Sequence, residues 1–275
     1  MTALAGRTGR TGRFSGRTCL ITGSTGMAAS AARAMAAEGG TVFIVSRTPA
    51  HAQMLAGEIA AEGGKAAWFA ADVSREGEVD AAVAACLAHT GRIDAVFSAA
   101  GISGRRFGDG PLDAVTLDGW ETVMRANATS QFLVCRAAIR QMLTQSPDEA
   151  GTRGAILTMS SALATHPSPA HFATHAYAAS KGAIEAFTRA VAAFYAPHAI
   201  RVNAVAPALV ATPMSERAQE DPQIRAYLAR KQPLAGGPID AGAVTRAVLF
   251  LLSDDARMLT GQVISVDGGW SVSEG

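Results

Sequence analysis

The sequence has few charged residues, few cysteines and no long apolar run, and each of these excludes a class of protein. Charged residues make up 17% of the 275 residues, and a net charge of +1 gives no electrostatic basis for binding nucleic acid. The cysteines Cys19, Cys86 and Cys135 show no metal-ligand or disulfide spacing, so we expect a reducing, cytoplasmic setting. No apolar run approaches the roughly 20 residues of a transmembrane helix, so no membrane association is expected.

Hydrophobic residues and glycine are abundant instead. A hydrophobic content of 49% with 28 glycines is typical of a compact α/β domain with a buried sheet and tight turns. Residues 1–16 form a basic, low-complexity segment that we expect to be a disordered tail, because such residues cannot bury enough apolar surface. A nucleic-acid arm or a targeting segment is the alternative, although the segment lacks the apolar core of a signal peptide. Residues 17–275 are expected to form a single domain.

Strand patterns alternate with helix patterns along this domain. Strands are expected at 18–22, 41–45, 66–71, 93–99, 155–159, 201–205 and 263–266, and helices at 28–38, 51–62, 75–89, 117–144, 176–195 and 241–252. Short strands that alternate with helices of this length indicate βαβ units. The pattern therefore predicts an α/β fold with a doubly wound parallel sheet of the Rossmann type.

The first strand-to-helix turn contains Gly23 and Gly26. Glycines at such a turn let the backbone approach a pyrophosphate, whose charge is favourable at the N-terminus of the helix. A plain turn is the alternative. A phosphate site is favoured because the turn follows the first strand of a βαβ series.

Tyr177 and Lys181 are four residues apart in a segment with a helical pattern. Residues i and i+4 share one face of a helix, so the phenol and the ammonium group can point into the same space. A free tyrosine titrates near about 10, and a fixed positive charge nearby would help it act as an acid/base group at neutral pH. A buried tyrosine beside a snorkelling lysine is the alternative interpretation.

These motifs together resemble the short-chain dehydrogenase/reductase family, in its compact single-domain type, from residue 17 to residue 270. The resemblance rests on eight pieces in family order. They are Thr22-Gly23 with Gly26, Asp72-Val73, Ala100-Gly101, Asn127, Ser160-Ser161, Tyr177 with Lys181, the segment 201–207 and the segment 260–270. The resemblance implies an NAD(P)-dependent oxidoreductase that interconverts a secondary alcohol and a ketone or aldehyde.

The sequence departs from the family pattern at three places. The turn has one residue fewer between Gly23 and Gly26 than the compact type, a spacing more like the epimerase-type relatives, and alanines stand where a last glycine is usual. Segment 98–101 replaces the usual Asn-Asn-Ala-Gly, so another group must satisfy the nearby backbone. Ala208 follows Pro207 where glycine is usual, which restricts the backbone beside the nicotinamide.

The resemblance also implies the catalytic roles. Tyr177 would exchange the proton with the substrate oxygen, and Lys181 would lower the pKa of that tyrosine and bond the nicotinamide ribose. Ser161 would hold the substrate oxygen, since the family uses the second serine of such a pair; a helix cap is its alternative role. Asn127 would anchor a water that links Lys181 to solvent, with a polar helix kink as the alternative.

The residues after the second strand bear on the choice of cofactor. Ser46 and Arg47 stand where an acidic residue would select NAD(H), so NADP(H) is favoured over NAD(H), although Arg47 could instead stack on the adenine. By resemblance, Asp72 would contact the adenine amino group and Thr212 the carboxamide. The full set implied for the cofactor is Gly23, Ser24, Thr25, Gly26, Met27, Ser46, Arg47, Asp72, Val73, Ala99, Ala100, Gly101, Tyr177, Lys181, Pro207, Val210 and Thr212.

Two further segments are expected near the substrate. Residues 162–175 hold three of the six histidines, but no cysteine or carboxylate completes a ligand set, so we expect a pocket wall and no metal site. Residues 214–238 have the composition of a mobile lid, with a plain surface excursion as the alternative.

Two alternative functions are considered beside the oxidoreductase, and the sequence also predicts an oligomeric state. A noncatalytic dinucleotide-binding sensor or scaffold, or an epimerase or dehydratase, is suggested only by the altered glycine turn. Apolar residues surround much of the helices that carry Asn127 and Tyr177, and the resemblance implies that such helices pair across a two-fold axis. We therefore expect a homotetramer, with a second contact through segment 263–270 and a dimer as the fallback.

Overall fold

A single seven-stranded parallel sheet forms the centre of the computed structural model, which describes residues 12–274. The strands follow the order β3-β2-β1-β4-β5-β6-β7, and every neighbouring pair is parallel. They are β1 (Thr18–Thr22), β2 (Thr41–Ser46), β3 (Lys65–Ala70), β4 (Ala95–Ser98), β5 (Gly154–Met159), β6 (Ile200–Pro207) and β7 (Val263–Val266). The order reverses between β1 and β4, where a doubly wound sheet opens a crevice for ligands. The predicted doubly wound parallel sheet is confirmed.

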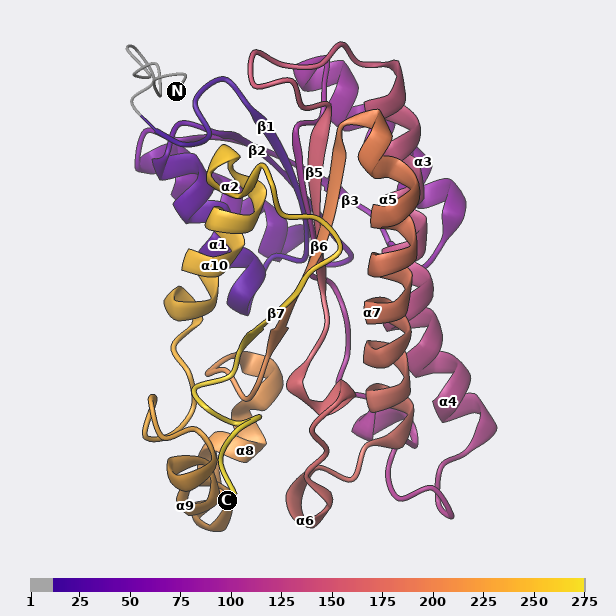
Figure 1. Ribbon diagram of the computed structural model, residues 1–275, viewed down its shortest axis with the longest axis vertical. Helices are drawn as coiled ribbons and strands as arrows, with labels where there is room; N and C mark the ends of the chain where they lie inside the picture. The colour runs from indigo at the N-terminus through magenta and orange to yellow at the C-terminus, as the bar shows by residue number, and fades with distance from the viewer. Residues whose placement is uncertain (1–11, 275) are drawn as a thin grey trace.

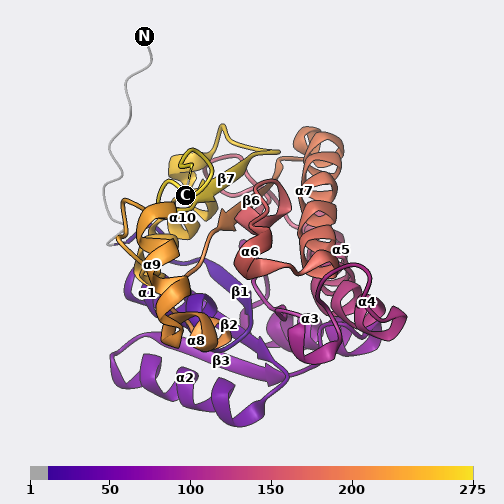
Figure 2. The same cartoon turned by 90° about the horizontal axis from the view of Figure 1, so that it is seen from below.

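Helices cover both faces of the sheet (Figure 1). The helices α1 (Gly26–Ala37), α2 (Pro49–Ala61) and α10 (Ala241–Leu252) cover one face. The other face carries α3 (Glu76–Thr90), α5 (Ser130–Thr144) and α7 (His175–Tyr195), with α4 (Leu117–Met124) packed against α7. Three short helices lie beyond the carboxyl ends of the strands, namely α6 (Pro169–Phe172), α8 (Glu216–Glu220) and α9 (Pro222–Lys231) (Figure 2).

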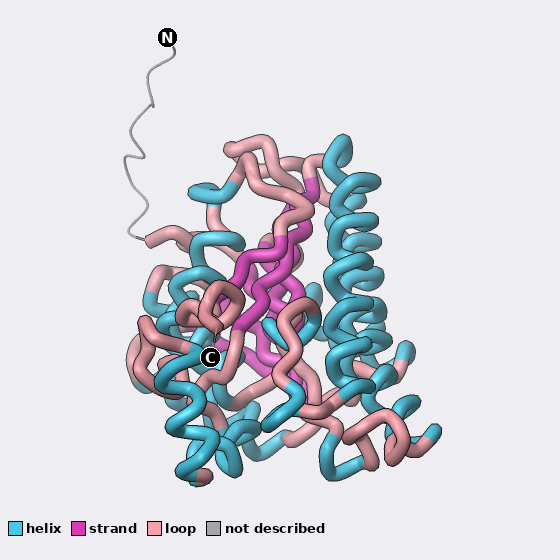
Figure 3. Tube along the Cα trace, turned by 60° about the horizontal axis from the view of Figure 1, so that its bottom comes forward, coloured by secondary structure: helices cyan, strands magenta, loops and turns pink. Residues whose placement is uncertain are grey.

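The core has two apolar layers, one on each face of the central strands. Figure 3 shows the strands enclosed between helices. Alternate residues of a strand point to opposite faces, so Ile21 and Ile44 join the layer under α1 and α2. Leu20 and Val96 point into the opposite layer. Because both faces are covered, β1, β4, β5 and β6 are buried along their whole length, and most of their residues are apolar.

The expected elements begin and end within two residues of those observed, with one exception. Residues 117–144 were expected as one helix, but a π-helical turn at Arg125–Thr129 separates α4 from α5. The turn occurs where the Asn127 side chain bonds both backbone groups of Ile102, and the Ser130 hydroxyl donates to the carbonyl oxygen of Ala126. The continuous helix was therefore wrong, because contacts outside the helix widen it at Asn127.

The chain is already packed ahead of residue 17. Phe14 is fully buried in the layer beneath α1, and its N–H donates to the carbonyl oxygen of Glu38 at 3.1 Å. Arg13 pairs with the Glu38 carboxylate. Of the expected tail of residues 1–16, residues 1–11 lie outside the described part of the chain. Residues 13–16 form a turn against the domain.

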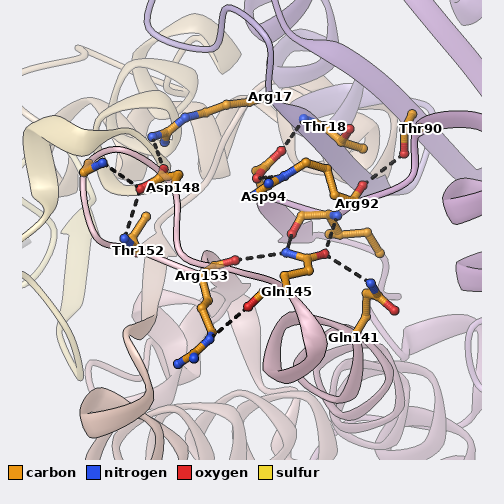
Figure 4. Close-up of polar contacts among 12 residues, drawn as sticks. Arg17, Thr18, Thr90, Arg92, Asp94, Gln141, Gln145, Asp148, Thr152 and Arg153 are labelled. Carbon is orange, nitrogen blue, oxygen red and sulfur yellow. Dashed lines mark hydrogen bonds and ion pairs between the residues drawn. The ribbon is translucent and has the colours of Figure 1, made fainter.

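Buried polar side chains connect strands at the end of the sheet opposite the crevice (Figure 4). The Gln145 side chain accepts the N–H of Ile93 at 2.8 Å and donates to the carbonyl oxygens of Ile93 and Arg153. The buried carboxylate of Asp94 accepts the N–H of Thr18 at 2.9 Å and the Arg92 Nε–H at 2.7 Å. These bonds fix the starts of β1, β4 and β5. In the part of the chain that the structure describes, no helix is long and apolar enough to cross a membrane.

Candidate active site

The glycine turn between β1 and α1 forms the floor of a cavity at the crevice. Gly23 has φ +100° and Gly26 has φ +55°, a left-handed conformation that other residues rarely adopt. A β-carbon on Gly26 would lie 3.1 Å from Cγ2 of Thr212. Ala28 and Ala29 are buried where the helix meets the sheet, so alanine fits in place of the usual glycine. The shortened turn therefore keeps its backbone open to a ligand.

The cavity has a volume of about 300 Å³ and brings together most of the residues expected at the cofactor. Those that line it are Gly23, Ser24, Thr25, Gly26, Met27, Ser46, Arg47, Asp72, Val73, Ala99, Ala100, Gly101 and Thr212. Tyr177 and Val210 line a neighbouring cavity instead, and Lys181 and Pro207 line neither. A long crevice over a glycine turn at the switch point of the sheet fits a dinucleotide.

The end of β2 is linked to the glycine turn by hydroxyl groups. Ser46 Oγ lies 2.8 Å from Ser24 Oγ, and it accepts the N–H of Thr48 at 3.3 Å. The exposed Arg47 lines the cavity beside Thr48 and His51. His51 was not expected at the site, although its position in the first turn of α2, just after β2, could have suggested it.

Asp72 keeps its carboxylate close to its own loop. Its Oδ1 accepts the N–H of Ser74 at 3.0 Å and the hydroxyl of Ser74 at 2.7 Å. Burial raises the pKa of Asp72, but the two bonds from Ser74 and the positive charges of Arg47 and Arg75 outweigh burial and lower it. The carboxylate is thus ionised at neutral pH at the edge of the cavity, within the electrostatic reach of Arg47.

Thr22 replaces the missing asparagines at the end of β4. Its Oγ1 accepts the N–H of Ala99 at 3.0 Å and the N–H of Ala100 at 3.1 Å. The backbone groups that the substituted segment 98–101 leaves open are therefore satisfied from the neighbouring strand. A β-carbon on Gly101 would lie 2.8 Å from Asn127 Oδ1 and 3.7 Å from Lys181 Nζ, so these two groups approach each other beside that glycine.

The serine pair after β5 divides into two roles. Ser160 is buried and its hydroxyl donates to the carbonyl oxygen of Lys181 at 3.2 Å and to the Glu185 carboxylate at 2.9 Å. Ser161 lines the neighbouring cavity with Tyr177, and its Oγ accepts the N–H of Leu163 at 3.2 Å. Ser161 is thus both a cap of the short turn after β5 and the serine that faces the cavity.

Tyr177 and Lys181 lie together on the first turns of α7. Burial raises the pKa of the Tyr177 phenol, and its hydrogen bond with Ser161 opposes that shift in part. Burial lowers the pKa of Lys181 to about 7, and its Nζ donates to the carbonyl oxygen of Met159 at 2.8 Å. The expected lowering of the Tyr177 pKa by Lys181 stays a prediction, because in this structure burial is the main influence on the phenol and the lysine bonds Met159.

Asn127 lies at the π-helical turn and is fully buried. Its Oδ1 accepts the N–H of Ile102 at 2.8 Å, and its Nδ2 donates to the Ile102 carbonyl oxygen and to Ser180 Oγ, each at 3.1 Å. The side chain thus joins the end of β4 to the helix that carries Tyr177. Its expected water link to Lys181 stays a prediction.

A second cavity of about 430 Å³ adjoins the first, and both include Met27, Thr212, Pro213 and Met214 in their walls. Ser161 and Tyr177 lie in its lining with both apolar and charged residues. The apolar members are Met27, Ala162, Leu163, Phe172, Ala208, Leu209, Val210, Pro213, Met214, Ala218 and Trp270. The charged members are Arg105, Arg106, Glu216, Arg217 and Glu220. The arrangement places a hydroxyl pair in a partly apolar chamber beside the dinucleotide crevice.

The two expected pocket segments both reach this second cavity. Phe172 and Thr174 represent the histidine-rich segment in its lining, and α8 contributes Glu216 and Arg217 from the expected lid. None of the histidines of segment 162–175 lines it. Within residues 12–274, no group of three or more histidine, cysteine or acidic side chains could hold a metal ion.

Comparisons with known proteins agree with this architecture. A family model described as enoyl-(acyl carrier protein) reductase matches residues 21–271. The cyclopentanol dehydrogenase of Comamonas sp. is 34% identical over 264 residues, which are 95% of this chain and 100% of that protein. The crystal structure of gluconate 5-dehydrogenase from Burkholderia cenocepacia in complex with NADP and tartrate is 30% identical and superposes with a TM-score of 0.86, covering 95% of this chain and 98% of that one. For 3-ketoacyl-(acyl-carrier-protein) reductase from Brucella melitensis complexed with NADH, the identity is 31% and the TM-score 0.82, over 94% and 99% of the two chains.

Proposed function

Since the chain belongs to the short-chain dehydrogenase/reductase family, we propose that Tyr177 is its acid/base group and that Ser161, Lys181 and Asn127 assist it. The protein is an NAD(P)-dependent oxidoreductase that interconverts an alcohol and the corresponding ketone or aldehyde. The observation that carries the proposal is that the two cavities adjoin and share lining residues. Tyr177 and Ser161 face the second cavity, and that cavity shares a wall with the dinucleotide crevice.

A bound nicotinamide would supply or accept the hydride, while side chains of this chain hold the substrate oxygen and move its proton. In carbonyl reduction, the phenol of Tyr177 gives its proton to the oxygen while Ser161 donates a hydrogen bond to the same oxygen. In alcohol oxidation, the alcohol proton passes to the phenolate of Tyr177. Burial favours the protonated phenol, so the oxidation direction needs the positive charge of Lys181 nearby.

The apolar part of the lining of the second cavity supports a small substrate with an apolar ring. Its volume of about 430 Å³ and the aromatic side chains of Phe172 and Trp270 suit a compact ring. Cyclopentanol, the substrate in the name of one relative, has this character. We therefore propose a cyclic secondary alcohol and its ketone as the substrate pair.

NADP(H) is proposed as the preferred cofactor. Ser46, Arg47, Thr48 and His51 surround the end of the crevice beyond β2, and they offer hydroxyl, guanidinium and imidazole groups to a ribose phosphate. Asp72 is the acidic residue in this lining, and its carboxylate is already engaged by Ser74. Related structures contain NADP in one case and NADH in another.

A homotetramer in the cytoplasm is proposed as the working state. The exposed side chains of Phe132 on α5 and Phe194 on α7 support pairing of these helices across a two-fold axis. The buried free thiols of Cys19, Cys86 and Cys135 support a reducing compartment.

The experiment that tests the catalytic proposal compares Tyr177→Phe with Tyr195→Phe, a matched change at the far end of the same helix. Turnover of cyclopentanol, cyclopentanone and a panel of ring ketones is followed by nicotinamide absorbance. We expect Tyr177→Phe to lose a factor of about 10² to 10⁴ in kcat with unchanged cofactor affinity, while Tyr195→Phe keeps its turnover. If Tyr177→Phe retains more than about a tenth of kcat, the tyrosine is not the acid/base group.

A further inference from the structure

A buried carboxylate, in a segment whose earlier residues line the substrate cavity, contacts the first turn of the helix that carries Tyr177. Asp109 lies in the segment between β4 and α4, and only 7% of its surface is exposed. Its Oδ1 accepts the N–H of Ala176 at 2.9 Å, and its Oδ2 accepts the N–H of Tyr177 at 2.9 Å. These partners are 67 and 68 residues away in the sequence, so the contact is made by the tertiary fold.

Asp109 does what a local helix cap would ordinarily do. The first N–H groups of a helix have no partner inside it, and a side-chain oxygen usually accepts them. Thr174 precedes α7 but provides no such bond, since its hydroxyl donates to the Phe172 carbonyl oxygen at 3.3 Å, and the first turn has no acidic residue. The Asp109 carboxylate therefore caps α7 from outside, where its negative charge also suits the helix dipole.

The segment that carries Asp109 also forms part of the substrate cavity. Ser103, Arg105 and Arg106 line that cavity, and Arg105 donates to the carbonyl oxygen of His171 at 2.9 Å. At the other end of the segment, the N–H of His175 donates to the Gly110 carbonyl oxygen at 3.4 Å. The cavity wall and the start of α7 are thus joined at several points around Asp109.

The backbone of the segment is shaped to bring this carboxylate inward. Gly104 has φ +84°, and a β-carbon there would lie 2.8 Å from Asp109 Oδ2 and 2.6 Å from a methyl group of Val123. Asn127 holds the start of the segment through Ile102. One short segment therefore contacts both Asn127 and the backbone of Tyr177, two groups of the proposed reaction.

We propose that Asp109 is a positioning residue that aligns the Tyr177 hydroxyl with the substrate oxygen and couples this alignment to the fit of substrate against residues 103–106. The inference rests on the proposed acid/base role of Tyr177. Because the phenol lies at the end of a long rigid side chain, a small tilt of the first turn of α7 is magnified at its oxygen. A misplacement of roughly 1 Å can cost about a hundredfold in rate.

The test compares Asp109→Asn and Asp109→Ala in the full-length enzyme with NADPH and cyclopentanone. Asparagine keeps the volume but turns an N–H₂ group toward one backbone N–H, and alanine removes both acceptors. We expect kcat to fall about tenfold and about a hundredfold respectively, with a smaller change in KM and with the cofactor Kd within about twofold. The solvent deuterium isotope effect on kcat should increase, because the misaligned proton transfer becomes slower. The amides of Ala176 and Tyr177 should exchange their hydrogen faster, which reports the loss of the cap directly.

Asp240→Asn is the matched control, since Asp240 caps α10 by accepting the N–H of Gly242 at 2.9 Å and lines neither cavity. It should lower stability and leave kcat and the isotope effect unchanged. If Asp109→Asn speeds exchange at Ala176 and Tyr177 but keeps the wild-type kcat and isotope effect, the carboxylate is only a structural cap and the inference is overturned. Retained turnover in Tyr177→Phe would instead overturn the proposed function, which separates the two failures.

Discussion

The Lys181 ammonium nitrogen lies 5.5 Å from the centre of the Tyr177 ring, while its hydrogen bond goes to the carbonyl oxygen of Met159 at 2.8 Å. Lys181 is fully surrounded by protein, and burial lowers its pKa to about 7. At neutral pH, Lys181 is therefore near the midpoint of its titration, so the positive charge that would support a Tyr177 phenolate is only partly present. The spacing of the two residues brings them together, and burial then opposes the positive charge that the proposed chemistry requires.

Lys181 should make the stability of the protein depend on pH. Its pKa falls from an ordinary 10.5 to about 7 on folding, so the unfolded chain holds the proton more tightly between these values. The free energy of unfolding should therefore rise with pH across this window, and the penalty of the buried charge is fully present below about pH 7. Replacement of Lys181 by methionine removes this contribution. As the pH increases from 6.5 to 9.5, it crosses about two-thirds of the interval between the two pKa values of Lys181. Over this range the stability of Lys181→Met relative to wild type should thus decline by an amount on the order of a few kcal/mol.

Urea unfolding at a series of pH values measures this effect. Lys65→Met provides the control, because Lys65 is an exposed lysine on β3. The difference between Lys65→Met and wild type should not vary with pH over the same range. If the difference in the free energy of unfolding between Lys181→Met and wild type does not vary with pH, burial does not lower the pKa of Lys181.

Arg47 should determine the preference between the two nicotinamide cofactors. It lies exposed at the cavity beside Thr48 and His51, where a 2′-phosphate would meet its guanidinium. We expect the native enzyme to have a higher kcat/KM with NADPH than with NADH. Arg47→Ala should reduce this ratio about tenfold or more, as one lost charge-assisted bond of about 1.5–3 kcal/mol requires.

Arg75→Ala is the matched control for Arg47→Ala. Arg75 is also exposed and its charge also lowers the pKa of Asp72, but it does not line the cavity. Its cofactor ratio should stay close to that of the native enzyme. Equal kcat/KM values for NADPH and NADH in the native protein would contradict the proposal that Arg47 binds the 2′-phosphate.

Thr22 should be required for stability as well as for cofactor binding. Its hydroxyl is the shared acceptor for the N–H groups of Ala99 and Ala100, and Thr22 itself is buried. Thr22→Val keeps the shape of the side chain but leaves these donors without their acceptor, which should cost about 1–3 kcal/mol. Thermal unfolding should detect this loss, and the affinity for NADPH should fall because both donors lie at the crevice.

Thr18→Val, at the other end of β1, is the comparison for Thr22→Val. The Thr18 hydroxyl makes no hydrogen bond to the residues described, so this change should cost less stability and leave cofactor affinity intact. If the two variants are equally stable, the Thr22 hydroxyl does not replace the asparagines usual at this strand end.

The sequence was sufficient for the features that depend on local pattern. The alternation of strands and helices predicted the sheet because each element carries its own period and its own turn residues. The pairing of Tyr177 with Lys181 also followed from local geometry, since residues i and i+4 share a helix face. Contacts between distant segments were beyond such reasoning. Asn127 widens its helix through a bond to Ile102, and Asp109 caps α7 from another segment, so no periodicity near either residue could reveal them.

The C-terminal segment shows the same limit. Its apolar character suggested a second contact between subunits, but Trp270 is buried within its own chain. The ring packs against Phe172 and Tyr227, with centroids 5.9 Å and 5.8 Å away, and its Nε1–H donates to the carbonyl oxygen of His166 at 3.0 Å. An apolar residue in sequence does not reveal whether its partner lies in the same chain or in another. A second subunit contact through segment 263–270 stays a prediction, and the partly exposed strand β7 at the edge of the sheet is the part of the segment open to such a contact.

The proposed pairing of α5 and α7 across a two-fold axis rests on side chains that the monomer leaves uncovered. Phe194 is 68% exposed and Phe132 is 41% exposed, whereas Leu133 and Ile184 on the same helices are buried. Phe132 also meets Phe187 edge to face at 6.3 Å, so the two helices share one aromatic surface. Such a surface is costly to expose to water, and a second copy of the same face would cover it.

Light scattering at micromolar protein should give four times the subunit mass of 28.2 kDa. Phe194→Glu should yield smaller species, because the buried charge opposes the pairing, while Met258→Glu, at an exposed residue outside these helices, should leave the mass unchanged. A single species of 28.2 kDa in the native protein would contradict the assembly.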